Sequence, residues 1–364
     1  MSTVNCPYCA EKILADAKKC KHCGEWVSNE RSDITAIIDT FANKYQIEQE
    51  VGRGGMAVVY KAIDRASQKV VALKVIPKEF TVDQEFVSRF QLEAKNCSKL
   101  NHSNIVRIFD YGEIGGFPFM VMELLEGQTP SQILKSRNKP FNNKDIRSIL
   151  IPLLDGLQHA HDKGLIHRDI KSSNIMFDSK GRPVLMDFGI SKNQTDTQKL
   201  TQVGTFIGTP EYSSPEQAET QAEIDHRSDI YSIGVVAYEM ASLQVPFRGK
   251  NPLAVLNDIV RKRAPNIRLK NPNISKPMSE AIMRAMEKNK LERFRSCKEF
   301  KNQLEIVDHN ARIGVQASLE PQEIKSGLEK FMVTYNLDTP KLILVFAAVM
   351  IIIISFIYIA LNLQ

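Results

Sequence analysis

The chain has 364 residues, of which 43% are hydrophobic and 25% are charged, so it can bury a large core and is not a disordered polymer. Its net charge of +6 is mild and no basic run is interleaved with aromatic residues, which argues against a nucleic-acid-binding protein. The opening residues, MSTVNCPYCA, lack the apolar core of a signal peptide, so we expect the bulk of the chain to stay in the cytosol.

Four of the six cysteines lie within the first 23 residues, in two CxxC pairs. The pairs are Cys6 with Cys9 and Cys20 with Cys23. Thiolates bind zinc tetrahedrally, and two such pairs close the coordination shell, so residues 1–27 are predicted to form a small zinc ribbon with a structural Zn²⁺. Two disulfides are the alternative, which a reducing cytosol disfavours. So short a segment buries little apolar surface, and metal binding would supply its folding energy.

The pattern of apolar residues changes along the rest of the chain. Residues 28–44 are polar with an amphipathic patch, and we interpret them as a linker without an assigned function. From Tyr45 to about Leu125, β-branched runs and turns surround one helix-like stretch, Glu85 to Leu100, which predicts a small sheet with one helix. The pattern from Gln132 onward is largely helical. We therefore predict an α+β protein in which a small β-rich lobe joins a larger α-rich lobe.

A glycine-rich segment, VGRGGMAVV, lies between two of the predicted strands. Glycines there let backbone N–H groups approach a triphosphate, and Val59 would cover an adenine. The third glycine of the pattern G-x-G-x-x-G-x-V is Ala57 here, whose methyl group we expect a strand to tolerate. Taken alone the segment is weak evidence, because glycine-rich hairpins are common. The candidate nucleotide-binding residues are Val51, Gly52, Arg53, Gly54, Gly55, Met56, Ala57, Val58 and Val59.

Lys74 lies on the next predicted strand, in the run VALK that also contains Ala72 of the expected nucleotide site. From an alternating strand its ammonium would reach the α- and β-phosphates of ATP, and Glu93 on the following helix is the fitting carboxylate partner. Without the other motifs, a solvated strand lysine would be the better interpretation.

Two further motifs follow in the α-rich part, His167 to Asn174 (HRDIKSSN) and Asp187 to Gly189 (DFG). Asp169 would accept the proton of a substrate hydroxyl, and Asn174 and Asp187 would hold magnesium at the phosphates. Together with the glycine-rich segment and Lys74, their order matches what phosphoryl transfer from ATP requires.

These motifs resemble the protein kinase family, especially its bacterial transmembrane Ser/Thr branch, over residues 45–305. The resemblance implies a two-lobed kinase fold, ATP and Mg²⁺ as cofactors, and protein substrates. It assigns Lys171 to steadying the γ-phosphate, which favours Ser/Thr over Tyr specificity. It also assigns Met122 as the gatekeeper and residues Glu123 to Leu125 as the hinge whose backbone meets adenine.

The segment GTPEYSSPE resembles the part of a kinase that docks the substrate. In the family its final glutamate, Glu216 here, pairs with a distant arginine, for which Arg293 is the candidate. The resemblance also implies that Asp229 braces the catalytic loop from a buried helix, and a helix N-cap is its alternative role.

Arg168 beside the catalytic aspartate indicates activation by phosphorylation of the segment between Asp187 and Glu216, the activation loop. A phosphate there could order the loop through this arginine. The candidate acceptors are Thr195, Thr197, Thr201 and Thr205. Their position relative to Ser214-Pro215-Glu216 favours Thr201 and then Thr205. Solvated loop threonines are the alternative for at least two of the four.

Residues 342–361 form an apolar run of twenty residues without a charge, which as a helix would be about 30 Å long and match a bilayer core. We predict a single transmembrane helix after a juxtamembrane segment, residues 306–341, with a buried core helix as the alternative. The lysines before the span are Lys325, Lys330 and Lys341. Only residues 362–364 follow it as an external tail, so the lysine bias predicts a cell-membrane protein whose kinase domain and N-terminus are cytoplasmic.

Three functions compete. An active kinase is favoured because the residues that pseudokinases commonly lose are present, namely Lys74, Asp169, Asn174 and Asp187. A non-catalytic membrane scaffold is the second possibility, and Ala57 is the feature that leans toward it. A nucleic-acid-binding ribbon is disfavoured by its nearly balanced charge. Membrane anchoring would raise the local concentration and favour phosphorylation in trans within a homodimer.

Overall fold

The computed structural model describes residues 3–6, 11–14, 30–54, 56–188, 209–219 and 223–306. The strands are β1 (Thr3–Asn5), β2 (Lys12–Leu14), β3 (Tyr45–Arg53), β4 (Val58–Asp64), β5 (Lys69–Val75), β6 (Ile108–Ile114), β7 (Phe117–Glu123), β8 (Ile175–Phe177) and β9 (Pro183–Leu185). The α-helices are α1 (Glu30–Phe41), α2 (Gln84–Cys97), α3 (Pro130–Arg137), α4 (Asn143–Asp162), α6 (Pro215–Ala218), α7 (Arg227–Ser242), α8 (Pro252–Arg261), α9 (Ile267–Lys270) and α10 (Lys276–Ala285), and residues 297–306 are also helical. Short 3₁₀ turns are η1 (Lys78–Phe80), η2 (Ser172–Asn174) and η3 (Pro210–Tyr212).

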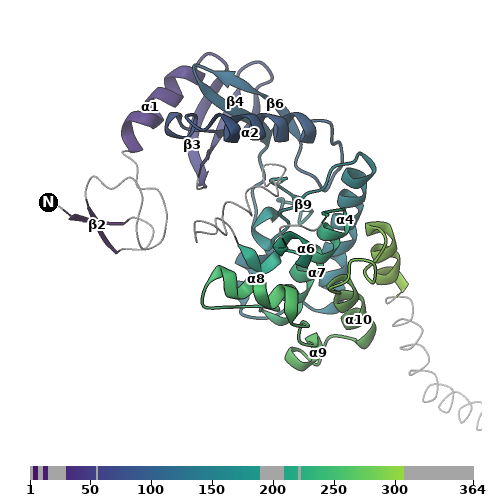
Figure 1. Ribbon diagram of the computed structural model, residues 1–364. Coiled ribbons are helices and arrows are strands. Elements are labelled where there is room, and N and C mark those ends of the chain that lie inside the picture. Colours follow the sequence, from purple (N-terminus) through teal and green to yellow (C-terminus); the bar gives the residue numbers. More distant parts are fainter. Residues whose placement is uncertain are drawn as a thin grey trace, which may run out of the picture. The chain divides into compact units, whose positions relative to one another are not determined.

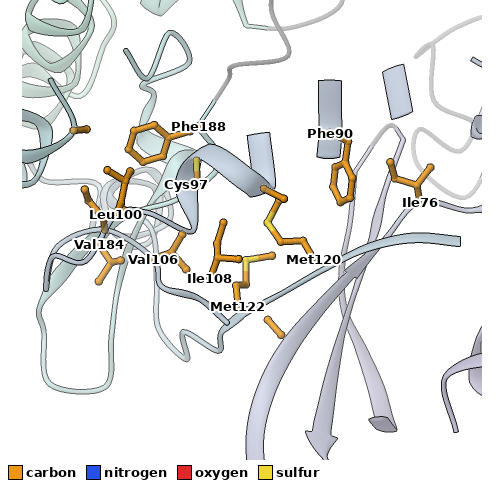
Figure 2. Close-up of a cluster of buried hydrophobic side chains, with 14 residues drawn as sticks. Ile76, Phe90, Cys97, Leu100, Val106, Ile108, Met120, Met122, Val184 and Phe188 are labelled. Carbon is orange, nitrogen blue, oxygen red and sulfur yellow. The ribbon is translucent and has the colours of Figure 1, made fainter. Parts of the chain in front are cut away.

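The first lobe is built on an antiparallel sheet of five strands in the order β3-β4-β5-β7-β6. Alternation along each strand gives the sheet two apolar faces. One face packs against α2 through Phe90, Ala94 and Cys97, and Figure 2 shows part of this cluster, which also includes Met120 and Phe188. The segment expected as a linker contains α1, which packs against β3 and contributes to the cluster on the other face (Figure 1).

The second lobe is mainly helical, and α7 is its central helix. All but three of its sixteen residues are buried, and the buried residues include the polar Ser228, Asp229 and Ser232. The longer α4 buries one face only, with apolar residues spaced three and four apart, and its N-cap is Asn142, whose side chain accepts from the Asp145 N–H. The short strands β8 and β9 pair with each other, β8 contacts α3 and β9 contacts α4. The DFG motif follows closely after β9.

One detail differs from the sequence-based expectations. Ala57 lies in the turn between β3 and β4 and not in a strand, and its carbonyl accepts a hydrogen bond of 2.9 Å from the Gly54 N–H. The alanine that replaces the third glycine therefore lies in the loop, one residue before β4 begins at Val58. Cys97 and Cys297 are free and buried.

Candidate active site

The loop that carries the HRD motif is fixed from inside the second lobe by Asp229 of α7. The Asp229 side chain is buried, with Oδ2 accepting the His167 N–H at 2.8 Å and Oδ1 accepting the Arg168 N–H at 2.9 Å. His161 of α4 adds a contact of 2.7 Å from its Nε2 to Oδ2. Burial raises the pKa of Asp229, but His161 and the neighbouring donors outweigh it and leave the pKa below its ordinary value. The expected bracing role of Asp229 is confirmed.

His167 is fully buried and forms the link between the catalytic loop and the DFG motif. Its ring stacks on Phe188 with centroids 4.4 Å apart, and Nε2 lies 3.0 Å from the Met186 carbonyl, to which it donates. Nδ1 accepts from the Asp169 N–H at 3.3 Å. Burial lowers the pKa of His167, which agrees with a neutral ring that donates on one side and accepts on the other.

Two of the predicted catalytic side chains, Lys171 and Asn174, converge on the carboxylate of a third, Asp169. Lys171 Nζ lies 3.0 Å from Asp169 Oδ2, and the Asn174 amide donates to the same oxygen at 3.0 Å. The Asn174 amide also donates to the Asp169 carbonyl at 2.9 Å. Because two partners fix its orientation, the Asp169 carboxylate is held ready to accept a proton from a hydroxyl placed beside it.

Lys74 pairs across the site with the DFG aspartate. Its Nζ lies 2.7 Å from Asp187 Oδ1. Burial lowers the pKa of Lys74, but the charges of Asp187 and Glu93 outweigh this and leave its pKa above the ordinary value. The charge of Lys74 in turn lowers the pKa of Asp187. Glu93 is buried on α2 and acts on Lys74 through its charge, while the short ion pair of Lys74 is with Asp187.

The site offers oxygen ligands suited to magnesium. Asn174 uses its amide nitrogen toward Asp169, which leaves the amide oxygen as a ligand, and Asp187 has a second carboxylate oxygen beside the one that binds Lys74. Hard oxygen donors from one carboxylate and one amide, completed by phosphates and water, are what Mg²⁺ prefers. The residues therefore fit the ion, and Asn174 and Asp187 would hold it, where it would neutralise phosphate charge.

The backbone is strained at two points of this constellation. Arg168 has φ of 63° and Asp187 has φ of 48°, both in the left-handed region that non-glycine residues seldom occupy. The carbonyl of Arg168 accepts from Gln217 Nε2 at 2.8 Å, which ties the catalytic loop to α6. Strained residues held by several neighbours are typical of functional sites.

Four of the residues expected around adenine belong to or pack against one apolar cluster, which also contains Ala160 of α4 and Val184 of β9. Ala72 and Met122 are buried members of it, and Val59 and Leu125 pack against it. Glu123 donates its N–H to the Arg107 carbonyl at 2.8 Å, and its carboxylate pairs with Arg182 at 2.7 Å. The Glu123–Arg182 ion pair therefore anchors the hinge to the segment between β8 and β9.

The glycine-rich segment forms the turn between two strands. Val51, Gly52 and Arg53 end strand β3, Gly54 and Met56 lie in the turn, and Val58 begins β4.

Sequence reasoning missed two supports of the site. One is His161, which lies in the run HAHD at the end of α4. The only local signal for it was its position in a helical pattern. The other is Glu239 of α7, which accepts from Tyr212 Oη at 2.7 Å and from Ser172 of the catalytic loop. No local signal could have indicated Glu239, because its partners are distant in the sequence.

Several predicted features fall outside the described residues. They are Gly55, Cys9, Cys20, Cys23, Thr195, Thr197, Thr201, Thr205 and residues 342–361.

Within the described part, Cys6 is buried directly after β1, and its N–H donates to the Glu11 carbonyl at 2.8 Å. No group of three or more His, Cys, Asp or Glu side chains placed to hold a metal occurs among the described residues. None of the helices in that same part combines the length and hydrophobicity needed to cross a membrane.

A five-stranded lobe joined to a helical lobe, with the lysine, HRD and DFG residues brought together, defines a protein kinase. The model of the protein kinase domain family matches residues 45–322, and the chain belongs to that family. It is 38% identical over 283 residues to the serine/threonine-protein kinase pkn3 of Myxococcus xanthus, covering 75% of this chain and 51% of the relative. It is 35% identical over 296 residues to the probable serine/threonine-protein kinase PknB of Corynebacterium glutamicum, covering 78% of this chain and 46% of the relative.

Among solved structures, the kinase domain of Mycobacterium tuberculosis PknI is similar, with a TM-score of 0.58 and 25% identity. The match covers 72% of this chain and 95% of that domain. The predicted two-lobed kinase fold is therefore confirmed, and the chain is of the bacterial Ser/Thr kinase type. The chain spans about half the length of the two curated relatives.

Proposed function

We propose that this chain transfers the γ-phosphate of ATP to serine or threonine hydroxyls of proteins. The observation that carries the proposal is the convergence of Lys171 and Asn174 on Asp169, next to the Lys74–Asp187 ion pair. Lys74 and Lys171 would bind phosphate oxygens, and Asp169 would orient the attacking hydroxyl and take its proton. Positioning and charge stabilisation of this kind supply most of the catalysis in phosphoryl transfer.

The test is transfer of labelled phosphate from ATP to a mixed protein substrate. Asp169→Asn should lower the rate by about a hundredfold or more, because the proton acceptor is lost. Glu280→Gln, which changes an exposed carboxylate on α10, should retain wild-type activity. Equal activity of wild type and Asp169→Asn would favour the non-catalytic scaffold.

We also propose that activation-loop phosphorylation at Thr201 or Thr205 regulates the enzyme. The support is the position of Arg168, whose backbone N–H donates to Asp229 and whose carbonyl accepts from Gln217. These two hydrogen bonds fix the backbone from which the Arg168 guanidinium would reach a phosphate. Phosphopeptide mapping after incubation with ATP and magnesium should find one of these threonines modified. An unmodified loop in an active preparation refutes this.

The apolar run at residues 342–361 supports a further proposal, a C-terminal membrane anchor with the kinase domain on the cytoplasmic side. The expected result is that carbonate-washed membranes retain the chain and release a version ending at Pro340. That truncation should also slow autophosphorylation at low protein concentration, because trans encounters between copies become rarer. An unchanged rate contradicts the trans mechanism.

The doubled CxxC pattern of Cys6, Cys9, Cys20 and Cys23 supports a structural zinc site, a proposal that elemental analysis can test. One equivalent of zinc is expected for the purified chain, and Cys20→Ser with Cys23→Ser should abolish it. Zinc content unchanged by the double substitution contradicts the assignment.

A further inference from the structure

Helix α1 precedes the part of the chain that the kinase family model matches, which starts at residue 45, yet it is packed like a core element. Ile37 and Phe41, one helical turn apart, are 1% and 0% exposed, whereas Ile38 between them is 40% exposed. The buried pair joins the apolar cluster on the sheet face opposite α2. A segment that only connected two domains would not bury two large side chains completely.

The sheet has a shaped seat for this helix at the β6–β7 turn. Gly115 in that turn has φ of 59°, and a Cβ added to it would lie 2.6 Å from Thr40 Cγ2. Only a glycine allows the helix to approach so closely. After α1, Lys44 in the turn and Tyr45 at the start of β3 both contact Asp110 Oδ2 of β6, through Nζ at 2.6 Å and Oη at 2.8 Å.

The contacts of α1 lead to the strand that carries Lys74. The ring of Phe41 meets the ring of Phe119 edge to face, with centroids 5.4 Å apart. Phe119 lies opposite Val75 in the β5–β7 register, and Val75 is fully buried in the cluster under α1. Because side chains alternate along a strand, Leu73 and Val75 face α1 while Lys74 between them faces the active site.

We propose that α1 is a positioning element of the active site. Phe41 supports strand β5 and thereby fixes the position of Lys74 relative to the nucleotide. The proposal rests on the ATP-dependent activity proposed above. It assigns residues 30–41 to the catalytic unit and gives the segment before the family domain a route to influence nucleotide binding. Phe41 touches no reacting atom, so its effect passes through Phe119 and Val75.

The test compares Phe41→Ala with Ile38→Ala in the full chain, using the dissociation constant of ATP with magnesium and the separate KM for ATP and kcat. Phe41→Ala should raise the dissociation constant and the KM by roughly threefold to tenfold, because β5 loses its support and Lys74 shifts. Ile38→Ala, on the exposed side of the same helix, should leave both unchanged. Phe41→Leu, which fills most of the space of the phenyl ring, should restore the dissociation constant and the KM.

If α1 only stabilises the fold, Phe41→Ala should give a different result. Loss of folded protein lowers the apparent kcat and the melting temperature but leaves the KM and the dissociation constant of the remaining enzyme at their wild-type values. That outcome, or an equal effect of Ile38→Ala, overturns the proposal. If Phe41→Ala does not fold, the milder truncations Phe41→Val and Ile37→Val decide, since wild-type nucleotide affinity in both overturns the positioning role.

The binding measurement also separates this proposal from the activity on which it rests. A wild-type chain that binds ATP but transfers no phosphate contradicts the proposed activity, and the Phe41→Ala comparison of dissociation constants still tests α1. A wild-type chain that neither binds nor uses ATP contradicts both.

Discussion

Arg293 and Glu216 form a bidentate ion pair in the interior of the helical lobe, with both nitrogen–oxygen distances at 2.7 Å. The two side chains are 0% and 7% exposed. The same guanidinium donates to the carbonyls of Arg227 and Glu287, and Ser228 donates to the carboxylate at 2.6 Å. The pairing expected from the sequence is confirmed, and it joins the SPE segment to the loop after α10.

Removing one partner should therefore be costly. Arg293→Met leaves the Glu216 carboxylate buried without its counter-charge, and we expect a loss of about 3–5 kcal/mol in the free energy of unfolding. Lys276→Met, which removes the exposed partner of Glu280, should cost less than about 1 kcal/mol. Urea unfolding followed by circular dichroism measures both, and similar losses for the two variants would contradict a special role of the buried pair.

The same ion pair predicts an acid limit of stability. Burial raises the pKa of Glu216, but Arg293 and Ser228 outweigh it and leave the pKa below its ordinary value of 4.5. A depressed carboxyl pKa contributes stability that is complete above the unfolded pKa and is lost as the pH falls through the folded pKa. The wild-type chain should therefore lose this contribution progressively below about pH 4.5. Melting temperatures from pH 3 to pH 7 should fall less steeply for Glu216→Gln, and identical slopes would exclude this source.

Asp229→Asn tests the bracing of the catalytic loop. The carboxylate accepts two backbone N–H groups and His161, and an amide cannot accept all three because one of its two ends is a donor. We expect kcat to fall by about tenfold to a hundredfold with a smaller change in the KM for ATP, since the loop that holds Asp169 is displaced. Asp258→Asn, a partly exposed carboxylate on α8, is the control and should retain the wild-type kcat.

Two glycines provide a matched test of the α1 seat. Gly115 and Gly164 both have positive φ, of 59° and 73°, but only Gly115 lies within reach of a neighbouring side chain. Alanine at either position pays the left-handed backbone cost of about 1–2 kcal/mol. Gly115→Ala should cost about 1–3 kcal/mol more, because its methyl group meets Thr40.

Thr40→Ser removes the methyl group that causes this clash and should recover part of the additional loss in Gly115→Ala. Unfolding free energies of the four variants measure the effect as a double-mutant cycle. No coupling between positions 40 and 115 would show that the turn does not seat the helix.

Local patterns in the sequence determined most of the chemistry. The HRD and DFG motifs, Lys74 on its strand and the helix after it all depend on spacing within a few residues, and the structure places α2 at Gln84–Cys97 where a helix was expected from Glu85. Short-range periodicity and turn residues suffice for such elements because their conformations depend mainly on neighbouring residues.

The tertiary structure decided which of these residues support one another. Sequence spacing could not show that Arg293 encloses Glu216 in a fully bidentate pair, that His161 completes the contacts of Asp229, or that Phe41 of an apparent linker packs over the strand of Lys74. Each of these relationships joins residues far apart in the chain, and it is fixed by burial and close packing, which depend on the whole fold and leave no mark in a local pattern.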